Sequence, residues 1–315
     1  MIVFPEKCLR KSVSVHNIDT HIFCDWIEGG IRFECDEISK SDVIDILLEN
    51  NIYLDQDYAA EFVENVWREL RRRLQVVGDN CRPFDFFHNR IRKVGEWQDF
   101  SGYSFCLILS FSTWYSDWAN QFGDDYTDQG LIFEELTKES LIALLPEWEV
   151  FQTGWSKENP VTIQEVIKDV ADRVGSSQGN VTNWVSPAAK DLGLDLVCHR
   201  PFLDERLGQP VFLIQCASGH NWDTKLHTPD QNVWDTIINW PSKPKKGFST
   251  PYSLSTDLFN QSCLRVNGLL LDRYRLLSAG HRNADWISGP LRDRIVDWVS
   301  PRATAVATQL VQAAA

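Results

Sequence analysis

The fold class of this chain is indicated by two apolar stretches, Gly193-Leu-Asp-Leu-Val-Cys198 and Val211-Phe-Leu-Ile-Gln-Cys216. Both are rich in valine, leucine and isoleucine over the length of a buried strand. The loop between them, 200–210, is rich in proline, glycine and charge, and it is short enough for a hairpin. The sequence therefore predicts two adjacent strands, the first carrying a carboxylate at Asp195 and the second an amide at Gln215.

Helical and strand patterns surround this hairpin. Apolar residues at helical spacing predict one helix over 131–145, which Pro146 ends, and another over 161–174. The remaining expected elements are helices at 222–227, 231–240 and 291–299, and strands at 247–254 and 268–277. This succession predicts a mixed α/β domain over residues 127–315.

Residues 1–126 are expected to form a separate α+β region for recognition or partner docking. Residues 12–36 alternate in strand fashion around a Gly-Gly turn signal, which predicts a hairpin or small sheet. A stripe over 59–74 predicts a long amphipathic helix, and the apolar run 103–111 predicts a buried strand. The basic run Arg71-Arg72-Arg73 is interpreted as a solvated face of that helix.

The composition is that of a folded globular protein. The chain has 315 residues, of which 43% are hydrophobic and 24% charged, and its formal net charge is −13. No apolar run approaches the ~18 residues that a membrane-spanning helix needs, and the N-terminus lacks the pattern of a secretory signal. The eight cysteines are scattered, without a CxxC pair, which favours reduced thiols in a cytoplasm over disulfides or a zinc site.

Oxygen-bearing side chains fall where a metal-dependent phosphodiesterase needs them. A carboxylate in an apolar strand, as at Asp195, is costly to bury unless it is paired or binds a cation. Gln215 would lie on the neighbouring strand, and Glu134 projects from the first turns of the 131–145 helix. Such a set suits Mg²⁺ or Mn²⁺. The alternatives are an Asp195 bonded to backbone or arginine, a Gln215 that only completes hydrogen bonds, and Glu135 in place of Glu134.

The order of these motifs resembles the PD-(D/E)XK nuclease superfamily, especially the Mrr-type restriction endonucleases. The resemblance rests on Phe-Glu-x-Leu at 133–136, Gly-Leu-Asp-Leu-Val at 193–197 and an apolar strand that ends in Gln215, and it spans residues 127–225. It implies a restriction-endonuclease-like core, a mixed sheet flanked by helices. It also implies that Glu134, which follows the phenylalanine, joins Asp195 and Gln215 in the metal site.

The chain departs from the family pattern at the catalytic lysine. Ala217 stands two residues after Gln215, and the next lysine along the chain is Lys225. Superfamily members with a lysine displaced to a neighbouring helix imply that Lys225 would orient or deprotonate the attacking water and stabilise the pentacovalent phosphate. The alternative is a solvated Lys225 in an inactive nuclease fold.

The resemblance implies divalent-metal-dependent hydrolysis of nucleic acid, with DNA expected, in bacterial restriction or anti-phage defence. A basic patch at Lys243, Lys245 and Lys246 is a candidate contact with the nucleic-acid backbone. The acidic total suggests a protein partner, an ATPase or helicase, that supplies DNA affinity. The rival hypothesis is a catalytically inactive binding or scaffold subunit.

Overall fold

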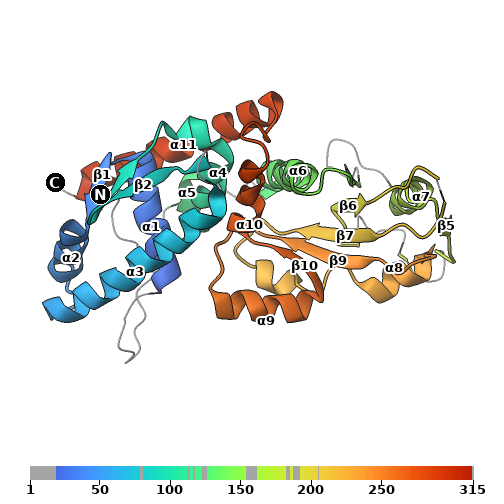
Figure 1. Ribbon diagram of the computed structural model, residues 1–315, viewed down its shortest axis with the longest axis horizontal. Helices are drawn as coiled ribbons and strands as arrows, with labels where there is room; N and C mark the ends of the chain where they lie inside the picture. Colours follow the sequence, from blue (N-terminus) through green and yellow to red (C-terminus); the bar gives the residue numbers. More distant parts are fainter. Residues whose placement is uncertain are drawn as a thin grey trace. The chain divides into compact units, whose positions relative to one another are not determined.

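The computed structural model describes residues 19–78, 81–111, 114–115, 118–122, 126–153, 162–181, 185–186, 192–204 and 206–313. They form a mixed α/β protein with two compact units (Figure 1). Unit 1 comprises Met1–Asp125, Pro251–Leu254 and Arg273–Ala315, and unit 2 comprises Tyr126–Thr250 and Ser255–Asp272. The C-terminal segment from Arg273, expected in the second domain, is therefore grouped with the N-terminal region. Among the described residues, no helix has both the length and the apolar character that crossing a membrane requires.

The described part of unit 2 is built on a five-stranded mixed sheet in the order β10-β9-β7-β6-β4. Its strands are β4 (Glu149–Gln152), β6 (Leu196–His199), β7 (Val211–Cys216), β9 (Lys245–Ser249) and β10 (Gly268–Leu271). The pairs β4–β6 and β6–β7 are antiparallel, whereas β7–β9 and β9–β10 are parallel. Leu196 pairs with Ile214 and His199 with Val211, which confirms the predicted hairpin.

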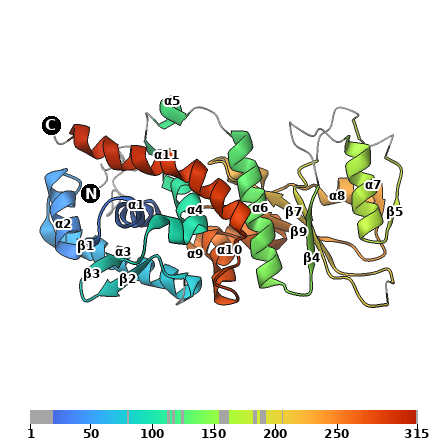
Figure 2. The same ribbon diagram turned by 90° about the horizontal axis from the view of Figure 1, so that it is seen from above.

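Helices cover both faces of this sheet. Figures 1 and 2 show α6 (Tyr126–Leu144) on one face and α9 (Thr256–Val266) on the other. The buried Thr137 hydroxyl lies 3.1 Å from that of Ser249 and thereby anchors α6 to the end of β9. The other described elements of unit 2 are α7 (Ile163–Arg173), the 3-10 helix η5 (Trp222–Lys225), α8 (Gln231–Ile237) and the short pair β5 (Ser177–Gln178) and β8 (Ile238–Asn239).

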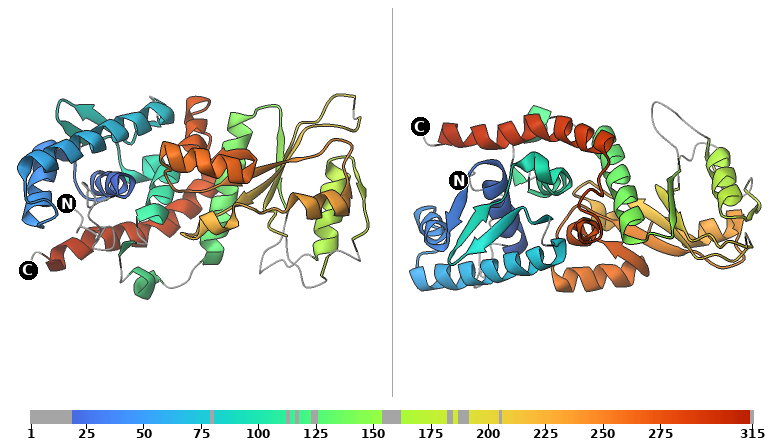
Figure 3. Two further views of the ribbon diagram at one scale, coloured as in Figure 1. Left: turned by 90° about the horizontal axis from the view of Figure 1, so that it is seen from below. Right: turned by 45° about the horizontal axis from the view of Figure 1, so that its top comes forward.

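Unit 1 is mainly helical. Figures 2 and 3 show α1 (Thr20–Phe33) and α4 (Ser101–Phe111) lying between α3 (Gln56–Val77) and the long α11 (Gly289–Ala313). A three-stranded antiparallel sheet has the order β1-β3-β2. The remaining elements are β1 (Glu37–Ser39), α2 (Lys40–Glu49), β2 (Phe84–Phe87), β3 (Arg90–Lys93), η3 (Trp97–Phe100), α5 (Trp118–Phe122), α10 (Arg273–Leu277) and η6 (Ser278–His281).

Several predicted strands are wrong. Residues 20–33 form α1, which Asp19 caps by accepting hydrogen bonds from the backbone of His21 and Ile22, while residues 12–18 lie outside the described ranges. The expected strand at 103–111 is the helix α4, whose residues 101–110 are all buried, and residues 273–277 form α10 rather than the end of a strand. The α4 segment is apolar on every side and has no polar face, so its periodicity cannot separate helix from strand.

The interpretation of all three arginines at 71–73 as a solvated face is wrong for Arg73, whose side chain is 0% exposed. Its guanidinium lies 2.7 Å from a carboxylate oxygen of Asp25 and 2.7 Å from one of Glu28. Arg273 binds the same two carboxylates at 2.8 and 3.3 Å, and Tyr274 donates to Glu28 at 2.9 Å. This buried ionic cluster ties α1, α3 and α10 together within unit 1.

The cluster controls the protonation of Asp25. Burial alone raises the pKa of this carboxyl, but Arg273, Arg73 and the hydrogen bond from Ser110 together outweigh burial and lower the pKa to about 2. Burial also raises the pKa of Tyr103, whose hydroxyl donates to Glu28 at 2.5 Å. The buried charges are therefore paired, as burial in a medium of low dielectric constant requires.

Candidate functional site

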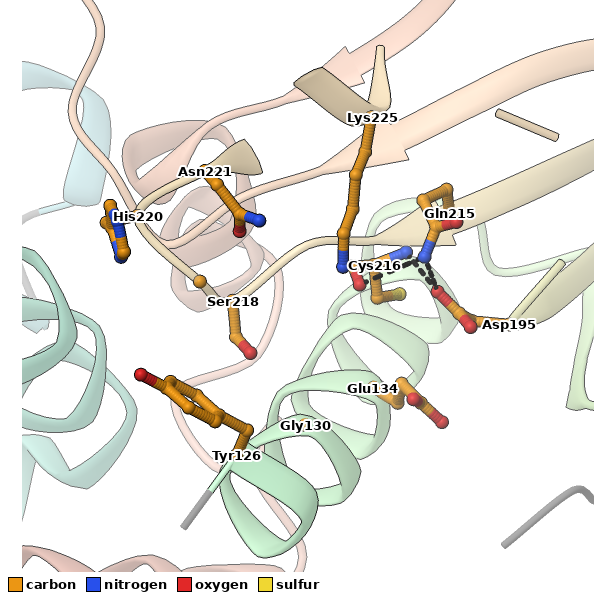
Figure 4. Close-up of a pocket in the computed structure, with 11 residues that line it drawn as sticks. Tyr126, Gly130, Glu134, Asp195, Gln215, Cys216, Ser218, His220, Asn221 and Lys225 are labelled. Carbon is orange, nitrogen blue, oxygen red and sulfur yellow. Dashed lines mark hydrogen bonds between the residues drawn. The ribbon is translucent and has the colours of Figure 1, made fainter. Parts of the chain in front are cut away.

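A pocket of about 550 Å³ opens in unit 2 where β7 ends and β6 begins, beside the first turns of α6 (Figure 4). The segment that follows β7 forms its other wall. Gln129 ties this segment to α6, because its Nε2 donates to the Ser218 carbonyl at 3.3 Å. The lining residues are Tyr126, Gly130, Glu134, Asp195, Gln215, Cys216, Ser218, Gly219, His220, Asn221 and Lys225.

Asp195 enters the pocket because the sheet holds its backbone. Its N–H donates to the Ile214 carbonyl at 3.0 Å, and its carbonyl accepts from Thr153 at 3.1 Å. The side chain turns toward the end of β7, where Oδ2 accepts the backbone N–H of Cys216 at 2.6 Å and the amide Nε2 of Gln215. These two donors share one carboxylate oxygen and so fix the orientation of the carboxylate.

Gln215 is 7% exposed, and both ends of its amide are bonded. Nε2 donates to Oδ2 of Asp195 and to the Cys216 carbonyl at 3.3 Å, while Oε1 lies 3.1 Å from the Thr228 hydroxyl. The amide nitrogen thus lies where a carboxylate oxygen and a carbonyl oxygen converge. A hard cation binds oxygen ligands, so the place between the Asp195 carboxylate and the Cys216 carbonyl, where the partly positive amide nitrogen lies, would also suit a cation.

Glu134 lines the same pocket from α6. Thr137, one turn later on the helix, anchors this stretch to β9, and Figure 4 shows the Glu134 and Asp195 carboxylates below the end of β7. Burial strongly raises the pKa of the Cys216 thiol, and the charges of Asp195 and Glu134 raise it further. Both carboxylates are therefore close enough to Cys216 to affect its pKa. Cys216 stays a thiol rather than a nucleophilic thiolate.

Lys225 reaches the pocket from η5. Figure 4 shows its extended side chain running toward the end of β7, where Gln215 and Cys216 lie. Ala217, at the position of the family lysine, is 1% exposed, and its backbone N–H donates to the Ser249 carbonyl at 2.9 Å. The structure thus brings together Glu134, Asp195, Gln215 and Lys225, the four residues singled out from the sequence.

The basic patch lies elsewhere: Lys243, Lys245 and Lys246 are not among the described residues that line the pocket. Lys243 is exposed and lies 3.0 Å from an Asp235 carboxylate oxygen, and Lys245 is exposed at the start of β9. The Nζ of Lys246 donates to the carbonyls of Leu226 and His227 at 3.2 and 3.3 Å, and partial burial lowers its pKa. Lys246 therefore holds the segment that follows Lys225.

Two groups that contact the polar side chains of the pocket could not be singled out from the sequence. One is Thr228, because a threonine beside a proline resembles any turn residue, and only the fold brings its hydroxyl to Gln215. The other is the backbone of Cys216, which offers both an N–H and a carbonyl to the polar cluster. Gly193 did carry a signal, since a glycine directly before an apolar strand often marks a close backbone approach.

A hard divalent cation suits the oxygen groups of this pocket. Among the described residues, no three His, Cys, Asp or Glu side chains form a metal-binding group, and two carboxylates, Glu134 and Asp195, line this pocket. Mg²⁺ is commonly held by one or two carboxylates together with water and substrate phosphate. The Cys216 carbonyl would supply a further oxygen ligand, and Gln215 would supply one if its amide oxygen took the place that Nε2 occupies beside Asp195.

The chain was compared with family models, curated proteins and solved structures. No family model matches the chain, and no curated protein or solved structure gives a significant match to it.

Proposed function

We propose that this chain is a metal-dependent nuclease of the PD-(D/E)XK type that hydrolyses phosphodiester bonds, with DNA as its substrate. The observation that carries the proposal is the convergence of Glu134, Asp195, Gln215 and Lys225 in one pocket. The order of elements supports the same assignment. Glu134 lies on the first described helix of unit 2, Asp195 directly precedes the second strand of its five-stranded sheet along the chain, and Gln215 lies on the third.

The proposed chemistry divides among these side chains. Glu134, Asp195 and Gln215 would hold a Mg²⁺ or Mn²⁺ ion, which supplies an acidified water and charge stabilisation at the phosphate. The water oxygen would bond to phosphorus and give up a proton to solvent, the bond from phosphorus to the leaving sugar oxygen would break, and that oxygen would take up a proton from solvent. Lys225 would orient the water and offset the negative charge that develops on the phosphate.

We also propose a cytoplasmic setting in bacterial restriction or anti-phage defence. The net charge of −13 disfavours strong DNA binding by this chain alone, which supports an ATPase or helicase partner that supplies DNA affinity. The exposed Lys243 and Lys245 are the members of the basic patch best placed to meet a nucleic-acid backbone, because the Nζ of Lys246 is engaged by carbonyl groups.

The second candidate function is a scaffold subunit that retains the nuclease fold without catalysis. It is favoured by the buried Ala217 at the position of the family lysine. The two functions differ in whether the wild-type chain cleaves any nucleic acid.

The deciding experiment compares wild type with Asp195→Asn on single- and double-stranded DNA and RNA, with Mg²⁺ or Mn²⁺. Asparagine keeps an oxygen to accept the Cys216 N–H, so the change removes the charge while sparing the local fold. We expect cleavage to fall by about 100-fold or more, because even supporting groups around a metal are worth 10–100-fold. Asp172→Asn, an exposed acid on α7, is the matched control and should cleave normally.

Full cleavage by Asp195→Asn would refute the site. Undetectable cleavage by the wild-type chain on every substrate, with candidate ATPase or helicase partners added, would favour the scaffold function instead.

A further inference from the structure

Gln215 presents the wrong end of its amide for the role that the proposed function gives it. Its Nε2, not its Oε1, faces Asp195 and the Cys216 carbonyl. An amide nitrogen donates two hydrogens and accepts none, so only the oxygen can bind a hard cation. A ligand role for Gln215 therefore requires its amide to turn over, exchanging the positions of Oε1 and Nε2.

Thr228 is the group that meets the other end of this amide. Its Oγ1 lies 3.1 Å from Oε1 of Gln215 and 2.7 Å from the carbonyl oxygen of Lys225. A hydroxyl has one hydrogen to donate and also lone pairs to accept, so it can partner either end of an amide. With the amide turned over, Nε2 donates to Oγ1 while the hydroxyl hydrogen goes to the Lys225 carbonyl.

Gly193 keeps the two side chains together. Its φ of +71° lies in the left-handed region, and a Cβ added there would lie 2.8 Å from Cβ of Thr228 and 3.0 Å from Oε1 of Gln215. The bare glycine backbone thus lets Thr228 and Gln215 pack closely. Gly193, in the turn that precedes β6, and Thr228, in the segment that follows η5, therefore both lie against the Gln215 amide.

We propose that Thr228 is a positioning residue that lets Gln215 turn its amide over when the pocket takes up a divalent cation. This inference rests on the proposed function, because it assumes that the cation is held beside Asp195. When no cation lies beside it, the Asp195 carboxylate attracts the amide N–H. With a cation there, that attraction is replaced, and Oε1 faces the cation while Thr228 accepts the displaced N–H.

The hydroxyl matters more in the turned orientation. In the orientation seen here, its single hydrogen is shared with the nearer Lys225 carbonyl, so Gln215 loses little when the hydroxyl is removed. After turning, the buried N–H would lose its acceptor, and an unpaired buried donor is costly. Removing the hydroxyl should therefore weaken cation binding. The Thr228 backbone N–H donates to the Lys225 carbonyl at 2.9 Å, and this hydrogen bond does not depend on the side chain. The local turn should therefore persist when the hydroxyl is removed.

The test measures Mg²⁺ and Mn²⁺ binding to the full chain by calorimetry, without nucleic acid. We expect Thr228→Val to raise the Kd about tenfold and Thr228→Ser, which keeps the hydroxyl, to restore it to nearly the wild-type value. Thr224→Val is the matched control, because the Thr224 hydroxyl donates to the Asn221 carbonyl in the same segment, whereas the Thr228 hydroxyl meets the Gln215 amide. It should leave the Kd unchanged.

A second measurement needs no variant. Nuclear Overhauser contacts from the Gln215 side-chain amide protons to the Thr228 methyl should appear when Mg²⁺ saturates the wild-type chain. Amide protons that stay beside Cys216 at saturation, or equal Kd values for wild type and Thr228→Val, would overturn the inference while leaving the proposed function in place. A wild-type chain that binds neither cation would overturn both.

Discussion

Replacing Arg73 by methionine should destabilise unit 1 far more than the same change at its neighbour Arg72. Methionine keeps the apolar stem of Arg73 but removes the guanidinium, which is fully buried and bonded to Asp25 and Glu28 at 2.7 Å each. Both carboxylates would then share Arg273 alone, which leaves one buried negative charge without a counterion. Breaking a buried pair from one side costs about 3–5 kcal/mol, and we expect a loss of that size.

Arg72 is the matched control on the same helix. Its side chain is 45% exposed and pairs with Glu69 at 2.7 Å, an arrangement worth about 1 kcal/mol or less. The assay is urea denaturation in which hydrogen exchange of peptides from α1 and α3 monitors unfolding. These peptides report on the stability of unit 1 separately from that of unit 2. If Arg73→Met and Arg72→Met lowered the free energy of unfolding by amounts within about 0.5 kcal/mol of each other, the stabilising role of the buried cluster would be refuted.

Two further predictions concern acid stability and the chemical step. Because the pKa of Asp25 is lowered from 3.8 to about 2, its contribution to the stability of unit 1 is complete above about pH 4 and is lost as the pH falls toward 2. Acid titration monitored by hydrogen exchange of α1 should show this slope, worth about 2 kcal/mol, and Asp25→Asn should lack it. Lys225→Ala should lower the single-turnover cleavage rate by about 100-fold, as loss of a group that stabilises transition-state charge does, while DNA binding in Ca²⁺ is retained. An unchanged rate would remove Lys225 from the mechanism.

The hairpin that carries Asp195 and Gln215, and the helix that carries Glu134, could be predicted from the sequence. Their apolar residues are bounded by loop signals: the loop 200–210 separates β6 from β7, and Pro146 follows α6. Local patterns of this kind depend on residues close together in the chain, so the sequence alone contains them.

Other features depended on residues far apart in the chain. The partners that bury Arg73 lie 48 and 45 residues away at Asp25 and Glu28, and Arg273 binds Asp25 across 248 residues. The helix α4 differs from the expected strand because its residues are apolar on every side, so its sequence has no polar face to reveal helical periodicity. The helix α1 does carry Asp25, Glu28 and Arg32 at helical spacing, but the Gly-Gly pair and the alternating apolar residues also fit a hairpin. Burial and charge pairing depend on which elements pack together, and for these residues the neighbouring sequence does not specify that packing.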